Sequence, residues 1–127
     1  MKLGLSALMA GVLVSGSCSQ PAAVSVICPD IFVFGLNVSV VDSVTGAGTG
    51  SGATVIARDG AYTDSTTRAA NGSDVATFGL AGERAGTYAV TVRKAGYQSW
   101  LRSGIQVAKA ECGVTPVAVT ARLQPGP

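Results

Sequence analysis

Residues 87–93 read TYAVTVR, which is the clearest strand pattern in the chain. Tyr88, Val90 and Val92 stand at alternate positions, with Thr91 and Arg93 in the opposite phase. Successive side chains of a β-strand point to opposite faces of the sheet. The alternation therefore predicts a strand with its tyrosine and valines in a core and its polar side chains in water. The Lys-Ala-Gly at 94–96 predicts a turn after it.

Strand patterns continue on both sides of this segment. We predict six further strands, at residues 34–40, 53–58, 61–65, 75–80, 97–103 and 114–123. The pattern also allows the strand at 97–103 to continue through Ile105 and Val107 after a break at Gly104. The pair Asp59-Gly60 predicts a hairpin, because both residues tolerate a positive φ. The whole pattern predicts an all-β, seven-stranded antiparallel β-sandwich, with a five-stranded barrel as the alternative.

The first eighteen residues have the pattern of a secretion signal. A positive start is followed by an apolar run at 3–14, which is shorter than the roughly 20 residues of a membrane-spanning helix. Small residues at 15–17 suit cleavage, so residues 1–17 are predicted to be a signal peptide. Cys18 directly after such a site resembles a bacterial lipobox, although Ser15 holds the place where leucine is usual.

The lipobox resemblance implies that Cys18 is lipidated and that residues 18–30 form a membrane-anchored tether. The protein is then exported to the cell envelope, on the outer membrane if the source is Gram-negative. Without lipidation it is secreted or periplasmic. Lipid on Cys18 leaves Cys28 and Cys112, an even pair in an exported protein, where disulfides persist. We therefore predict a Cys28–Cys112 disulfide, with two free buried thiols as the alternative.

Several function classes are disfavoured by composition. The chain contains no histidine, which excludes Ser-His-Asp and Cys-His catalysis and imidazole ligands for metals. The net charge is only +2 and the basic residues are scattered, so nucleic acid is not an expected partner. Asp59, Asp64 and Asp74 lie in or beside loops, but their spacing matches no calcium-binding loop. We predict no enzymatic activity, no cofactor and no metal.

Two short motifs carry a family resemblance. Gly86-Thr87-Tyr88 followed by Gly96-Tyr97, with an early Thr45-Gly46 pair, resembles the carboxypeptidase regulatory-like family. The resemblance covers roughly residues 31–123 and implies a transthyretin-like (prealbumin-like) sandwich, here a domain at 31–124 with a tail at 125–127. It also implies a non-catalytic companion role. Hydroxyisourate hydrolases, which are relatives of this sandwich, use histidines that this chain lacks.

The C-terminal part of the chain resembles envelope lipoproteins built on the same domain. The segment at 112–117 reads CGVTPV, and in those proteins a cysteine just before the last strand pairs with one near the start. A polar residue, often histidine, commonly follows that cysteine, whereas Gly113 stands here. The departure removes any role that the polar residue has in the family.

These observations predict a non-catalytic envelope lipoprotein that serves as a structural or protein-interaction module. Its partners are the membrane, through the lipid, and an envelope protein that meets the loops at 42–52 and 66–74. The alternative is a carbohydrate-binding accessory domain. Its candidate binding patch is Tyr97, Trp100 and Arg102, because aromatic rings stack on sugars and Trp and Arg dominate binding hot spots. Trp100 is otherwise explained as a cover over one edge of the core.

Overall fold

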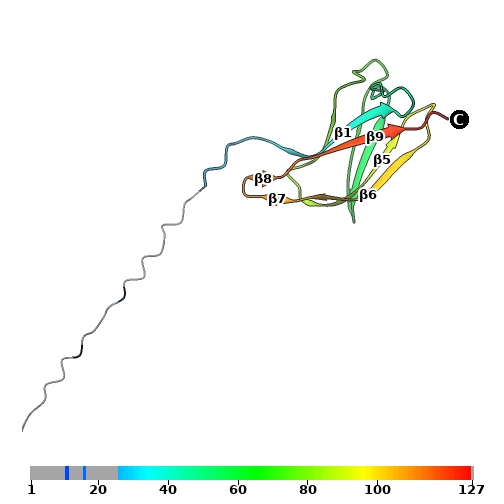
Figure 1. Cartoon of the computed structure of the whole chain (residues 1–127). Helices are drawn as coiled ribbons and strands as arrows, with labels where there is room; N and C mark the ends of the chain where they lie inside the picture. The colour runs from blue at the N-terminus through cyan, green and yellow to red at the C-terminus, as the bar shows by residue number, and fades with distance from the viewer. Residues whose placement is uncertain (1–10, 12–15, 17–25, 127) are drawn as a thin grey trace, which may run out of the picture.

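The computed structural model describes residues 11, 16 and 26–126, so Cys18 and all but two residues of the predicted signal peptide lie outside the described residues (Figure 1). The described chain is all-β, as predicted, and no helix is found in it. Its strands are β1 (Phe34–Asp42), β2 (Thr54–Asp59), β3 (Tyr62–Thr67), β4 (Phe78–Gly82), β5 (Gly86–Arg93), β6 (Trp100–Val107), β7 (Lys109–Ala110), β8 (Gly113–Val114) and β9 (Val117–Leu123).

The strands form two sheets and a small hairpin. One sheet has the order β4-β1-β9, the other β3-β2-β5-β6, and β7 pairs with β8. Among the described pairs, β1 and β9 run parallel and the others antiparallel. The prediction of a purely antiparallel sandwich is therefore wrong for this pair. Parallel neighbours require a long crossover connection, and the chain supplies one by placing all its other strands between β1 and β9.

One hydrophobic core lies between the two sheets and gives a sandwich-like arrangement (Figure 1). Tyr88, Val90 and Val92 are fully buried, which confirms the alternation predicted for residues 87–93. The same alternation fills the core from β2, β9 and most of β1. Fully buried side chains with large volumes are Tyr88, Leu36, Leu80, Leu123, Val38, Val55, Val90, Val92 and Val119.

The alternation of inward and outward side chains is interrupted at the start of β1. Gly35 is buried and a Cβ there would lie 2.9 Å from the Val107 side chain, so Gly35 faces inward. Leu36, directly after it, is also buried. Phe34 consequently lies on the outer side, 42% exposed, although its sequence parity with Leu36 predicted the core side. The change of phase leaves an aromatic ring on the surface.

The predicted fourth strand, 75–80, begins too early. β4 starts at Phe78 because the Arg68 guanidinium binds the carbonyl oxygens of the residues before it. These bonds run to Ala76 at 2.7 Å, Ser73 at 2.9 Å and Thr77 at 3.1 Å. The guanidinium also lies 4.0 Å above the Phe78 ring. These contacts hold residues 73–77 in a loop before β4.

The last predicted strands also differ in their bounds. β6 continues through Gly104, which adopts a φ of 72°, but its register with β5 shifts here, since Tyr88 pairs with Ile105 and Val90 with Arg102. The break predicted at Gly104 is therefore an irregularity within one strand. Tyr97 lies in the preceding turn and forms an isolated bridge with Pro125. The predicted strand at 114–123 is divided into β8 and β9 around Pro116, which has no N–H to donate to a sheet.

Candidate functional site

The domain has two ends that differ in what they present. β1, β5 and β9 end on one side, where the loops at 43–53, 68–77 and 94–99 lie with residues 124–126; we call this the distal end. The segment at 26–33, the turn at 83–85 and the β7–β8 hairpin lie on the other side, the tether end. Figure 1 shows the chain running into β1 beside β7 and β8.

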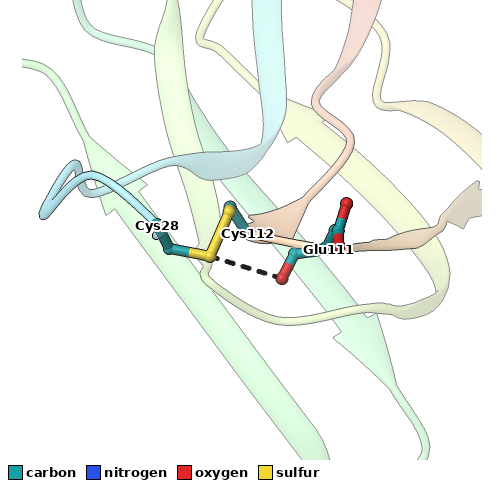
Figure 2. Close-up of a disulfide and its surroundings, with 3 residues drawn as sticks. All are labelled: Cys28, Glu111 and Cys112. Carbon is teal, nitrogen blue, oxygen red and sulfur yellow. Dashed lines mark hydrogen bonds between the residues drawn. A yellow bond between two sulfur atoms is a disulfide. The ribbon is translucent and has the colours of Figure 1, made fainter. Parts of the chain in front are cut away.

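A disulfide fixes the tether end. Cys28 and Cys112 are bonded, with their Cα atoms 5.2 Å apart, so the predicted pair is confirmed and free thiols are excluded (Figure 2). The Sγ of Cys28 also lies 3.5 Å from the carbonyl oxygen of Glu111. Because Cys112 lies in the turn between β7 and β8, the bond fastens the segment before β1 to this hairpin.

A second connection joins this segment to the turn between β4 and β5. The backbone N–H of Glu83 donates to the carbonyl of Val33 at 2.8 Å, and the Glu83 carboxylate accepts from the N–H of Val33. Ala81 and Glu83 both have a φ of 53°, which non-glycine residues seldom adopt. The turn is therefore built around its bonds to Val33.

An open hollow of about 320 Å³ lies beside the disulfide. Asp30, Glu83 and Glu111 contribute carboxylates to its lining, together with Ile31 and Phe32. Within the described part of the chain, no three carboxylates or cysteines converge in a way that would hold a metal ion. The hollow is therefore an acidic and partly apolar surface.

Asp59, Asp64 and Asp74 are each held by a separate structural contact. Asp59 accepts from the Arg84 guanidinium at 2.9 Å. Asp64 accepts from the backbone N–H of Ala81 at 2.9 Å, which ties β3 to β4 across the sheets. Asp74 accepts from the backbone N–H of Ser51 at 3.0 Å. Asp59 and Asp64 lie on β2 and β3 and Asp74 lies in a loop, and each holds a different part of the backbone or a different side chain.

The distal end is organised by hydrogen bonds between loops. The Asp74 carboxylate accepts from the hydroxyl of Ser51 as well as from its N–H, and these bonds hold the pKa of Asp74 below its ordinary value of 3.8. The N–H of Gly50 donates to the carbonyl of Asp74 at 3.1 Å. The loop after β1 and the loop before β4 therefore form one connected surface.

The turn between β5 and β6 joins the same surface. The Lys94 ammonium donates to the carbonyl and hydroxyl oxygens of Thr49, at 2.8 and 2.6 Å. The Tyr97 hydroxyl donates to Asp42 at 2.8 Å. Bonds from the N–H groups of Thr45 and Val44 and from Tyr97 hold the pKa of Asp42 below 3.8, with the N–H of Thr45 as the largest cause. Three loops are thus fixed relative to one another.

Two apolar side chains project from this hydrogen-bonded end. Val44 is 74% exposed in the loop at 43–53, and Val75 is 81% exposed in the loop at 68–77, one residue beyond the loop at 66–74 that was predicted to meet a partner. Neither valine is predicted as a contact from the sequence, because Val44 is a single apolar residue in a polar loop and Val75 falls in the strand predicted at 75–80. They are the strongest contact candidates that the structure adds at the distal end.

The predicted patch of Tyr97, Trp100 and Arg102 is spread over β6 and the turn before it. Tyr97 and Trp100 are half-buried against the core, as expected for Trp100 in its role as a cover over the core edge. Arg102 is exposed, opposite Val90 in the register. Among the described side chains, no aromatic or cation–π contact joins the three residues. Their binding role stays a prediction.

Comparison of this chain with models of protein families and with curated proteins finds no match. In residues 26–126, no helix has the length and apolar character needed to cross a membrane.

Proposed function

We propose that the protein is a non-catalytic envelope lipoprotein in which Cys18 carries the lipid and the distal end contacts a partner protein. The observation that carries the proposal is that the domain has two different ends. The chain arrives at the tether end, where the Cys28–Cys112 disulfide fastens it, and the loops at 42–52 and 66–74 lie at the opposite end. An anchored domain built in this way holds its loops away from the membrane.

The disulfide supports export, because such bonds persist outside the cytoplasm. The finer fold belongs to the proposal as well: the seven longer strands form a transthyretin-like sandwich of the carboxypeptidase regulatory-like family. The single core between a three-stranded and a four-stranded sheet supports it. Because the sequence has no histidine, the proposal assigns the domain no reaction.

The distal end suits protein binding for two physical reasons. Its loops are fixed before any partner arrives, by Lys94 on Thr49 and by Asp74 on Ser51. Such order reduces the entropy lost on binding. Val44 and Val75 provide apolar surface among polar groups, which is the usual composition of a contact site. The partner is therefore expected to present a small apolar surface with a polar rim.

The anchor is tested by metabolic labelling with an alkyne fatty acid in a bacterial host. The wild-type chain should take up label and Cys18→Ala should take up none. Label that persists in Cys18→Ala, or that never enters the wild type, rejects the lipoprotein assignment. Because Cys28 and Cys112 are already bonded, they do not compete for the acyl chain.

The partner surface is tested with a photo-crosslinking amino acid at Val44 or Val75 in intact envelopes. The matched control is Leu101, which is 66% exposed on the edge strand β6, outside the two loops that carry Val44 and Val75. A specific adduct from positions 44 and 75, but not from 101, supports the proposal. Equal adducts from all three positions would show non-specific contact, and no adduct from 44 and 75 would reject the distal surface.

The carbohydrate-binding alternative depends on the exposed part of the Trp100 ring. Trp100 is the only tryptophan, so its fluorescence reports this position alone. Titration with envelope glycans should shift the emission if the ring stacks on sugar. An unchanged spectrum at millimolar glycan rejects this alternative and leaves the protein-binding proposal untouched.

A further inference from the structure

The segment that leads into β1 exposes more apolar surface than any other described segment. Residues 26–34, which we call the lead segment, include Ile31 at 66% and Phe32 at 64% exposure, with Val26, Ile27 and Phe34 also exposed. The other large exposed apolar residues lie singly on loops or on β6. Clustered apolar exposure of this kind marks a contact surface.

The two phenylalanines are held in place on the surface. Their rings meet edge to face, with centroids 5.0 Å apart. A Cβ at Gly79 would lie 2.4 Å from the Phe34 ring, and one at Gly82 would lie 2.2 Å from the Phe32 ring. Each ring therefore rests on a glycine of β4 and turns its other side outward. Gly79 and Gly82 leave the space that makes this position available.

The position of the lead segment identifies what it can reach. Cys18 precedes Cys28 by ten residues, and ten residues span at most about 33–36 Å when fully extended. The disulfide fixes Cys28 to the folded domain. A membrane anchor at Cys18 consequently keeps the lead segment within that distance of the bilayer, with the distal end on the far side of the domain.

The charges beside the lead segment select the kind of lipid. Carboxylates of Asp30, Glu83 and Glu111 line the hollow next to Ile31 and Phe32, and no lysine or arginine is among its described lining residues. Anionic headgroups would be repelled from this surface. Headgroups that end in an ammonium group, as in phosphatidylethanolamine, can pair with the carboxylates while their acyl chains accept apolar side chains.

We propose that the lead segment docks on a zwitterionic phospholipid surface, with Ile31, Phe32 and Phe34 at the boundary between headgroups and acyl chains. This inference rests on the proposed anchor at Cys18 and deepens it. The lipid attaches the chain, and the apolar lead segment sets the orientation of the domain on the membrane. Interfacial contacts of this type reach about 5–10 Å into a bilayer.

The chain contains its own probes for a test. It has three phenylalanines, of which Phe32 and Phe34 lie in the lead segment and Phe78 is buried in the core. Labelling with 4-fluorophenylalanine gives three ¹⁹F resonances, and Phe32→Leu and Phe34→Leu assign them. With the disulfide formed, Cys18 is the one remaining thiol of the three cysteines. The mature chain is coupled through it to a maleimide phospholipid in vesicles.

The vesicles contain phosphatidylcholine and phosphatidylethanolamine, with a fraction of lipid that is spin-labelled on the acyl chain. The lines of Phe32 and Phe34 should broaden on the order of threefold or more relative to Phe78, because interfacial side chains approach the acyl region. Ile31→Ser should reduce the broadening. Leu101→Ser, a matched control with the same 66% exposure, should not.

Three results would overturn the inference. Sharp Phe32 and Phe34 lines on the vesicles would show that the lead segment does not touch lipid. Lines that shift with protein concentration in the absence of lipid would show that a second copy covers the segment. Greater broadening on phosphatidylglycerol vesicles would reject the zwitterionic surface. The chemical coupling replaces native acylation in this experiment. An absence of native lipidation would therefore be seen only in the fatty-acid labelling, and an absence of docking only in the vesicle experiment.

Discussion

Removal of the disulfide should be the most damaging change that leaves the core sequence intact. The bond joins residues 84 positions apart. A closed loop of this size reduces the conformational entropy of the unfolded chain, which raises the free energy of unfolding by about 4.5 kcal/mol at 25 °C. Cys28 itself is exposed and contributes little packing. The variant Cys28→Ala/Cys112→Ala should therefore lose about 2–4.5 kcal/mol of unfolding free energy.

Urea denaturation of the wild type, the double variant and the reduced wild type measures this loss. The double variant and the reduced wild type should agree, and both should have a higher m value, because an unbridged unfolded chain exposes more surface. The midpoint of thermal unfolding should fall by about 10–30 °C for a domain of this size. Cys18→Ala, which keeps the bond, should unfold as the wild type does.

The entropic reasoning would be refuted by a loss under about 1 kcal/mol with an unchanged m value. It would also be refuted if the loss came with altered strand pairing in the folded state. Hydrogen exchange of β1 and β9 distinguishes these cases, because loss of the bond alone should leave their protection pattern in place while lowering its magnitude.

The remaining predictions concern single side chains. The pKa of Asp74 is lower in the folded protein than its ordinary value of 3.8, so the ionised carboxylate stabilises the fold above pH 3.8, and this stabilisation is lost as the pH falls through the folded pKa. In Asp74→Asn, the melting temperature should therefore depend less on pH below 3.8 than it does in the wild type. Tyr88→Phe should cost about 1–2 kcal/mol in urea titrations, since its hydroxyl donates to the Arg84 carbonyl at 2.7 Å. Gly79→Ala should cost about 1 kcal/mol and move the Phe34 fluorine line, and an unmoved line contradicts the ring contact.

The core was predictable because alternation is a direct consequence of strand geometry. Tyr88, Val90 and Val92 are buried as expected, and so are Val119, Ala121 and Leu123 on β9. The direction of β9 was not predictable, since period two is the same for parallel and antiparallel strands. The long stretch of chain between β1 and β9 permits the parallel pairing but does not by itself predict it.

Two local errors have a common cause in contacts between distant residues. The sequence at 75–80 alternates like a strand, but Arg68 takes the carbonyls of Ala76 and Thr77. Phe34 resembles a core residue, but the empty space over Gly79 accepts its ring on the outer face. Neither contact can be predicted from the local sequence, because each depends on a residue that lies far away in the chain.

The candidate sites divide in the same way. The Cys28–Cys112 bond was predictable from the number of cysteines, because the expected lipidation of Cys18 leaves the other two as an even pair. The bonds of Lys94 to Thr49 and of Asp74 to Ser51 were not. These bonds join loops whose positions are set by the strands. Because loop sequences have no periodic pattern, the contacts between them cannot be predicted from the sequence.

The parallel pairing of β1 with β9 has a consequence for how the protein is made. β1 at residues 34–42 needs residues 117–123 as its neighbour, so the three-stranded sheet cannot be completed while the later part of the chain is still being synthesised. Contacts this distant in sequence form slowly. A nascent chain that stays incompletely folded until β9 emerges would suit the export proposed above, because an unfolded chain passes through a narrow channel more easily than a folded domain.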